Sequence, residues 1–194
     1  MKIFLSILAI FAGFSASAQT SPSKEVQLKL AVMAAPEDQQ AEATVYGYAD
    51  AGEIVLLKQG TNELVCLADN PAVEGLSVSA YHKSAQPFMA RGWELKKEGK
   101  TFQEIFEIRE AESKSGKLPL PDQGSLLNVL TAENADVDWA TGEVKNSYMR
   151  SVVYIPWATA ESTGLPLKPA GPGLPWIMDP GTHRAHIMIN PAKD

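Results

Sequence analysis

Short runs in which apolar and polar residues alternate occur along the chain together with longer runs at helical spacing. Such a mixture of periods two and 3.6 is typical of an α+β fold. The first apolar run with strand character is followed by Asp50-Ala51-Gly52, a three-residue loop ending in glycine that is typical of a β-hairpin. We predict that the first three strands form a β-meander, with a fourth strand after it. The predicted strands cover residues 44–49, 53–58, 63–68 and 76–82.

Helical patterns stand before and after these strands. The first predicted helix covers residues 24–34, and a second covers residues 86–98, where Phe88 and Leu95 share one face. Thr101-Phe102-Gln103-Glu104 matches a capping box and begins a third helix, which Gly116 ends. We expect the buried stripe of this third helix to consist of Phe102, Ile105, Phe106 and Ile108.

The last third of the chain returns to strand patterns, at residues 125–131, 149–157 and 185–189. Residues 136–143 are interpreted as a plain turn, because the glycine is misplaced for an EF-hand calcium loop. Residues 164–181 contain too many prolines and glycines for helix or central strand, and they predict an extended segment across the body of the domain. The whole pattern predicts a mainly antiparallel sheet with two or three helices packed on it, forming a single domain over residues 19–194.

Residues 1–18 have the order of a secretory signal peptide. Lys2 supplies a positive start, residues 3–14 are almost continuously apolar, and Ala16-Ser17-Ala18 is a small-residue cleavage site. The apolar run is too short to cross a bilayer, and no later stretch approaches that length. We therefore predict a secreted or periplasmic protein whose mature chain does not span a membrane.

Composition narrows the possible classes further. Of the 194 residues, 45% are apolar and 21% charged, which argues against a disordered chain. A formal net charge of -6 argues against a nucleic-acid partner held by a basic surface. The single cysteine cannot pair within the chain, and Cys66 lies in an apolar run where a thiol packs as a small buried hydrophobe.

Three histidines are the main candidates for catalysis or metal binding, because the common nucleophile, phosphate and dinucleotide motifs are absent from the sequence. His82 ends the fourth strand, while His183 and His186 flank the start of the last one. Together they form a possible site for a divalent metal such as zinc, with Asp179 or Glu161 as an oxygen ligand. In a second interpretation, one of them acts as a general base. In a third, they are separate structural or surface residues.

Aromatic residues give a different functional hypothesis. Trp157 and Trp176 each follow a rigid proline, and Tyr81 lies in a strand near the middle of the chain. Exposed aromatic side chains in an exported protein bind sugars, peptides or small apolar molecules. The alternative is that these side chains belong to the core, where large aromatics are commonly found.

Two groups of segments carry a resemblance to uncharacterised exported bacterial proteins. The first reads Glu161-Ser162-Thr163-Gly164-Leu165-Pro166, Pro175-Trp176-Ile177-Met178-Asp179-Pro180-Gly181-Thr182 and Ala185-His186-Ile187-Met188. The second reads Leu64-Val65-Cys66-Leu67-Ala68-Asp69 and Pro87-Phe88-Met89-Ala90-Arg91-Gly92. The resemblance implies bacterial export and one compact domain, and it implies no activity.

Two functions are therefore carried forward. The first is a binding or accessory protein for a small extracellular ligand such as a saccharide, with Tyr81, Trp157 and Trp176 at the site. The second is a metal-assisted or histidine-dependent hydrolase that uses His82, His183 and His186.

Overall fold

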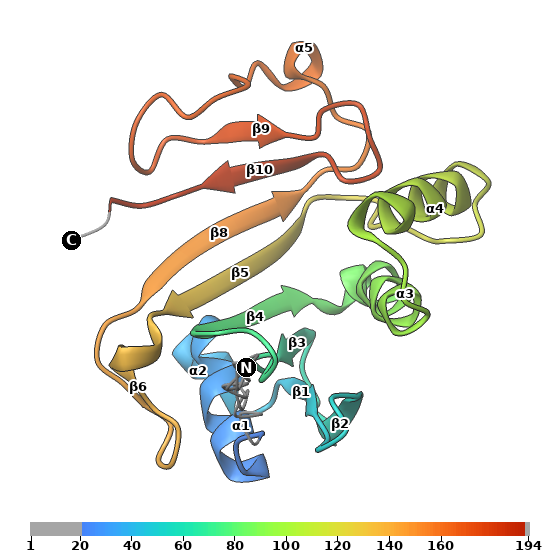
Figure 1. Ribbon diagram of the computed structural model, residues 1–194. Coiled ribbons are helices and arrows are strands. Elements are labelled where there is room, and N and C mark those ends of the chain that lie inside the picture. The colour runs from blue at the N-terminus through green and yellow to red at the C-terminus, as the bar shows by residue number, and fades with distance from the viewer. Residues whose placement is uncertain (1–20, 193–194) are drawn as a thin grey trace, which may run out of the picture.

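A single eight-stranded sheet organises the chain (Figure 1). The computed structural model describes residues 21–192, and the predicted signal peptide lies outside them. The strands lie in the order β2-β1-β3-β4-β5-β8-β10-β9, and neighbours are antiparallel except for β1 and β3. The predicted α+β class with a mainly antiparallel sheet is confirmed. The strands are β1 (Thr44–Tyr48), β2 (Ile54–Lys58), β3 (Leu64–Leu67), β4 (Leu76–His82), β5 (Ser125–Ala132), β8 (Tyr148–Tyr154), β9 (Trp176–Met178) and β10 (His186–Ile189).

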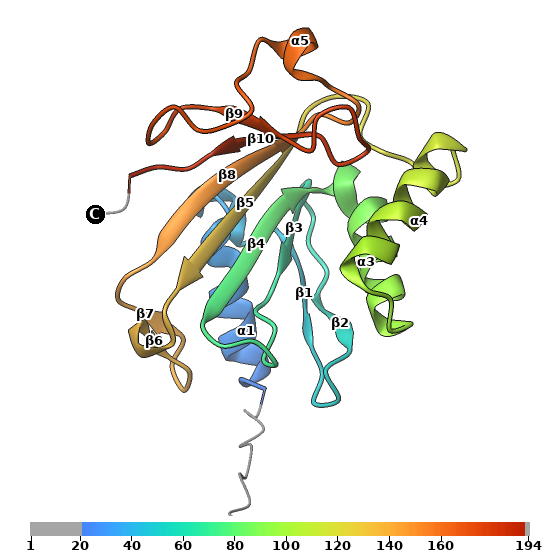
Figure 2. The same cartoon turned by 45° about the horizontal axis from the view of Figure 1, so that its top comes forward.

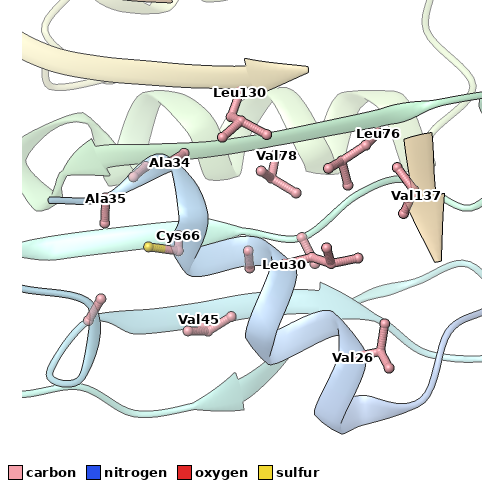
Figure 3. Close-up of a cluster of buried hydrophobic side chains, with 14 residues drawn as sticks. Val26, Leu30, Ala34, Ala35, Val45, Cys66, Leu76, Val78, Leu130 and Val137 are labelled. Atoms are coloured by element: carbon pink, nitrogen blue, oxygen red, sulfur yellow. The ribbon is translucent and has the colours of Figure 1, made fainter. Parts of the chain in front are cut away.

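One face of the sheet packs against the N-terminal helix. Helix α1 (Lys24–Ala31) begins after Ser23, whose hydroxyl accepts a hydrogen bond from the Val26 N–H at 3.3 Å. The 3-10 helix η1 (Val32–Ala34) and the short helix α2 (Glu37–Gln40) follow it. Leu30 of α1 packs with aliphatic side chains of β1, β3 and β4 in a buried core (Figure 3). The predicted first helix is confirmed, because its apolar residues cover this face.

The predicted β-meander is wrong, because β3 pairs with β1 in parallel instead of following β2. The chain leaves β2 and crosses the start of β1, where Gly60 N–H donates to Thr44 Oγ1 at 3.0 Å. A Cβ on Gly60 would lie 2.2 Å from the backbone oxygen of Glu42, so only glycine fits this crossing. The predicted hairpin at Asp50-Ala51-Gly52 is confirmed, because β1 and β2 on either side of it pair in antiparallel fashion.

Helix α3 (Gln86–Lys97), which follows η2 (Lys83–Ala85), lies toward the other face of the sheet, and α4 (Phe102–Lys114) lies outside α3 (Figure 2). The capping box of α4 is confirmed: Thr101 N–H donates to Glu104 Oε2 at 2.8 Å, and Glu104 N–H donates to Thr101 Oγ1 at 3.3 Å. The predicted buried stripe is wrong, since no α4 residue is buried and Phe102 is 70% exposed. Helix α4 packs against α3 and nearby loops instead of lying on the sheet, so its apolar side is only half covered.

The chain between β5 and β8 and the chain after β8 are mostly loop. Residues 134–136 form the 3-10 helix η3, and a small hairpin of β6 (Val137–Asp138) and β7 (Glu143–Val144) contains the predicted turn. After β8 comes the single-turn helix α5 (Ala160–Thr163). Residues 164–175 contain no helix or strand and fold back beside β9, where Ile177 N–H donates to the Pro166 carbonyl at 3.0 Å. Among the described helices, none is long and apolar enough to cross a bilayer.

Candidate functional site

A groove of about 970 Å³ lies between α3, the β1–β2 hairpin and the loop after β3. Its volume falls in the range of small-molecule binding sites, roughly 300–1,000 Å³. The aromatic side chains along it come from β1 and α3, and the polar ones come from both sides. The residues that decide its chemistry are Tyr46, Tyr48, Trp93, Gln86, Asn70 and Ala90.

The aromatic wall of the groove follows from the alternation of side chains along β1. Val45 points into the core beside α1, so Tyr46 and Tyr48 extend from the opposite face. Trp93, on the side of α3 that faces the sheet, packs against Tyr46 with ring centroids 5.2 Å apart and planes tilted by 56°. All three rings are partly exposed. A ligand in the groove therefore meets aromatic surface that is already held in place.

The loop on the β3 side of the groove is fixed by a buried carboxylate. Asp69 is 7% exposed, and its Oδ1 accepts a hydrogen bond from the Ser77 N–H at 2.7 Å. Burial raises the pKa of Asp69 to about 6, against the lowering effect of hydrogen bonds from the Ser77 and Asn70 backbone. Asn70 then turns the chain by accepting the Ala72 N–H on Oδ1 at 3.1 Å. The groove-lining segment after Asp69 is thus anchored by two side chains of its own.

The mouth of the groove is bridged by an ion pair. Lys97 Nζ, at the end of α3, lies 2.7 Å from Glu53 Oε1 on the β1–β2 loop. The same hydrogen bond lowers the pKa of Glu53, with the charge of Lys97 as the second cause. On the helix side, Glu94 Oε2 lies 3.0 Å from Arg91 Nη1. Charges along the groove are therefore compensated largely by side chains of the protein itself.

The aromatic residues proposed from sequence do not line this groove. Tyr81 is fully buried, and its hydroxyl donates to Gln86 Oε1 at 2.6 Å, so it supports a groove residue from behind. Burial also raises the pKa of Tyr81. Trp157 is 38% exposed and lies under Lys114, whose Nζ is 5.8 Å from the ring centroid. Trp176 packs in the cluster that includes Met188 and Tyr154. Tyr81 belongs to the same cluster as Trp176, but Trp157 does not, so the three residues do not line one site.

His82 has a local structural role. As the N-cap of η2, its Nδ1 accepts the Ser84 N–H at 3.2 Å, while Nε2 lies 3.8 Å from Glu63 Oε2. A backbone N–H can only donate, so Nδ1 must be the unprotonated nitrogen of this imidazole. These contacts of His82 are with Ser84 and Glu63, and none is with His183 or His186.

His183 and His186 are buried near α4 and the end of β8. His183 Nδ1 lies 3.3 Å from Glu110 Oε2, and a carboxylate only accepts, so Nδ1 carries the proton. His186 Nδ1 donates to the Arg184 carbonyl at 2.6 Å. Burial lowers the pKa of both imidazoles, with the Glu110 hydrogen bond opposing this at His183 and the Arg184 carbonyl opposing it at His186.

The oxygen ligands suggested for a metal have other partners. Asp179 Oδ2 lies 3.5 Å from Arg184 Nε. Glu161 is in the first turn of α5, where hydrogen bonds from its own backbone N–H and from Thr159 lower its pKa. Over residues 21–192, no three histidine, cysteine, aspartate or glutamate side chains are grouped so that they could hold a metal ion. The three-histidine zinc site predicted from sequence is not assembled in this part of the chain.

The prediction for Cys66 agrees with the structure. Its side chain is fully buried in the core beside α1, and burial raises the pKa of the thiol to about 11. A thiol with a raised pKa carries little thiolate at neutral pH, so Cys66 acts as a small core residue.

A second groove, of about 670 Å³, lies between α1 and the β6–β7 hairpin. Lys29 lines it and donates from Nζ to the Thr141 carbonyl at 2.9 Å. Val32 and Met33 form its apolar side, and Asp136 and Asp138 belong to its polar side. None of its lining side chains is aromatic, so the first groove has the stronger features of a binding site.

Sequence reasoning missed the residues of the first groove. Tyr46 and Tyr48 were placed correctly in a strand, and Trp93 was placed in a helix, but nothing local indicated that the two elements meet. The available signal was the Tyr46-Gly47-Tyr48 pattern, which puts two aromatic rings on one face of a strand. Comparisons with protein families, curated proteins and solved structures gave no match for this chain.

Proposed function

We propose that the protein is an exported binding protein that holds a small organic molecule in the groove between α3 and the β1–β2 hairpin. The observation that carries the proposal is the 970 Å³ groove with Tyr46, Tyr48 and Trp93 along it. Export is supported by the signal-peptide pattern of residues 1–18. This proposal keeps the binding role inferred from sequence and moves the site away from Trp157 and Trp176.

The fixed geometry of the aromatic side chains supports a binding site, as opposed to an irregular surface without a function. Tyr46 and Trp93 pack against the cluster of Val65 and Tyr81 beneath them, so their rings are held before any ligand arrives. Holding side chains in the binding geometry reduces the entropy lost on association. The ion pair of Lys97 and Glu53 further ties the two walls together.

The test uses a variant that fills the groove without removing the aromatic side chains. Ala90 lines the groove from α3 and is half-buried, so Ala90→Leu places additional volume in the binding space. Ala111→Leu makes the same change on an exposed position of α4 and serves as the matched control. A chemically diverse library of small molecules is screened against the purified protein by two-dimensional NMR, with resonances assigned.

We expect compounds that shift the Tyr46 and Trp93 resonances in the wild type and in Ala111→Leu, with at least tenfold weaker binding to Ala90→Leu. Two results contradict the proposal. One is a library in which no compound shifts these resonances, and the other is binding that Ala90→Leu leaves unchanged.

A further inference from the structure

The charged side chains of the groove are largely neutralised by one another. Glu53 pairs with Lys97 at 2.7 Å, and Glu94 pairs with Arg91 at 3.0 Å. Lys96 is the remaining charged residue along the groove, and it is exposed near the end of α3. An ionic ligand gains most where a protein offers an uncompensated opposite charge in a desolvated position. These side chains offer no such position.

The groove instead presents neutral hydrogen-bonding groups. Gln86 Oε1 already accepts the Tyr81 hydroxyl proton at 2.6 Å, which leaves the amino group of this carboxamide as its donor. Asn70 has the same arrangement, because its Oδ1 accepts the Ala72 N–H at 3.1 Å. The hydroxyl groups of Tyr46 and Tyr48 can both donate and accept. Both carboxamides are thus fixed in orientation by contacts within the protein.

Aromatic surface completes this set of groups. The rings of Tyr46 and Trp93 are tilted by 56° with centroids 5.2 Å apart, so they form a bent apolar surface. A pyranose ring has an apolar face of C–H groups and an equatorial rim of hydroxyl groups. The C–H face packs against an aromatic ring, and the hydroxyl rim forms hydrogen bonds with fixed amide donors and tyrosine hydroxyls.

We propose that the ligand of this groove is a neutral saccharide, packed on Tyr46 and Trp93 and hydrogen-bonded by the amino groups of Gln86 and Asn70. This inference rests on the proposed function, because it names the ligand class of the same site. No covalent step is involved. Specificity comes from the two carboxamide donors, since a hydroxyl-lacking molecule leaves them without partners when it displaces water.

The experiment compares ligand classes on the purified protein by isothermal titration calorimetry and NMR. Maltotetraose, cellotetraose and tetra-N-acetylchitotetraose are the neutral saccharide probes. Tetragalacturonate represents acidic saccharides, hexanoate represents small anions, and N-phenyl-1-naphthylamine represents uncharged aromatic molecules. We expect at least one neutral saccharide to shift the Tyr46 and Trp93 resonances, with an affinity that changes less than twofold between 50 and 500 mM salt.

Three variants test the mechanism. Gln86→Glu keeps an oxygen to accept from Tyr81 but removes the amino donor, and we expect saccharide binding to weaken at least tenfold. Asn70→Asp keeps the acceptor for Ala72 N–H and loses the donor in the same way. Lys96→Met removes the exposed charge along the groove and tests whether that charge binds the ligand. Lys168→Met, at an exposed lysine outside the groove, is the control, with saccharide affinity expected within twofold of wild type.

The outcomes separate this inference from the proposed function. If other compounds bind and are blocked by Ala90→Leu while all three neutral saccharides fail, the ligand class is wrong and the groove function stands. Binding restricted to tetragalacturonate or hexanoate, and lost in Lys96→Met, also overturns the neutral class. If no probe and no library compound reaches the groove, the proposed function itself fails.

Discussion

The two faces of the sheet are packed in different ways. The face beneath α1 is aliphatic and closed: Leu30 is 1% exposed, and Val45 and Cys66 are fully buried (Figure 3). The opposite face, on the side of α3, contains aromatic rings, ion pairs and a groove. A dry aliphatic contact contributes stability in proportion to the area buried, whereas aromatic and polar contacts around a groove leave groups available to a ligand. The first face therefore holds the fold together, and the second presents the site.

Helix α4, on the side of the molecule that contains the groove, is weakly packed. It has no buried residue, and three polar atoms in or next to it are buried without a partner among the described residues, namely Arg109 Nε, Ser113 Oγ and His183 Nε2. Burial lowers the pKa of Arg109 to about 10, a sign that the guanidinium is poorly solvated. An element with little buried apolar area and unsatisfied polar groups opens locally before the global unfolding of the protein.

The largest effect is expected from the closed face. Leu30→Ala removes a side chain that is 1% exposed and leaves a cavity between α1 and the sheet. We expect a loss of about 3 kcal/mol in the free energy of unfolding, measured by urea denaturation. Ile105→Ala on α4 is the matched variant, and because Ile105 is only half-buried its loss is expected to be about 1 kcal/mol. Equal losses of stability at the two positions would contradict the difference in packing between the α1 face and α4.

The next largest effect is expected at Asp69, as a dependence of the free energy of unfolding on pH. The pKa of its carboxyl is raised from 3.8 to about 6 by burial, so the unfolded chain loses the proton at lower pH than the folded one. Stability from this group is complete below about pH 4 and declines as the pH rises through 6. Between pH 4 and 7 the wild type is expected to lose on the order of 2 kcal/mol through Asp69.

Asp69→Asn cannot titrate, so its stability should decline less over the same range. The measurement is a series of urea unfolding curves at half-unit pH intervals for both proteins. The two pH profiles are compared by slope, because the amide also alters the hydrogen bond from Ser77. Parallel profiles would show that the carboxyl of Asp69 titrates normally in the folded protein.

A smaller effect is expected at the contact that joins α4 to α3. Arg91 contacts Glu112 through two bonds of 2.9 Å, Nε to Oε2 and Nη2 to Oε1, and Glu112 is 12% exposed. The same contact lowers the pKa of Glu112, with Arg91 as the main cause. Lysine cannot form both bonds, so Arg91→Lys should cost about 1 kcal/mol.

Amide hydrogen exchange shows which helix the loss of stability in Arg91→Lys affects. Amide exchange in α4 is expected to accelerate in Arg91→Lys while amides of α1 keep their protection, because the contact joins only the outer helix. Lys100→Arg, an exchange of cations on the adjoining loop, is the control. Acceleration in both helices alike would mean that α4 is as strongly coupled to the core as α1.

The sequence was informative where local chemistry determines the structure. The bounds of β4 match the predicted range, because polar Ser77 and Ser79 alternate with apolar neighbours. The start of α4 follows from Thr101 and Glu104, which satisfy each other's backbone groups within one turn. Such elements need no knowledge of distant residues.

The groove could not be predicted because it depends on contacts between distant segments. Tyr46 and Trp93 meet only because α3 returns over the end of the sheet that contains β1. The same reason explains the error on α4: the apolar spacing of Phe102 and Phe106 indicates a buried helix, yet Arg184 lies over both rings at 5.1 and 6.0 Å. A cation covering an aromatic ring takes the place of the expected core contact.

The smallest effect on stability is expected at the mouth of the groove, where Lys97 and Glu53 are 75% and 54% exposed. Exposed ion pairs contribute roughly 0.2–1 kcal/mol, and salt weakens them. Lys97→Met should therefore reduce the stability by no more than about 0.5 kcal/mol.

The effect of Lys97→Met on the groove should be clearer than its effect on stability, because the ion pair ties α3 to the β1–β2 loop. Faster amide exchange at residues 50–53 in Lys97→Met, reproduced in the wild type by high salt, would show that the pair restrains the mouth. Lys145→Met, an exposed lysine on the loop after β7, is the control and should leave that exchange unchanged. If the loop exchanges at the same rate in all three proteins, the hairpin holds its position without the ion pair, and the groove face is more rigid than its exposed contacts indicate.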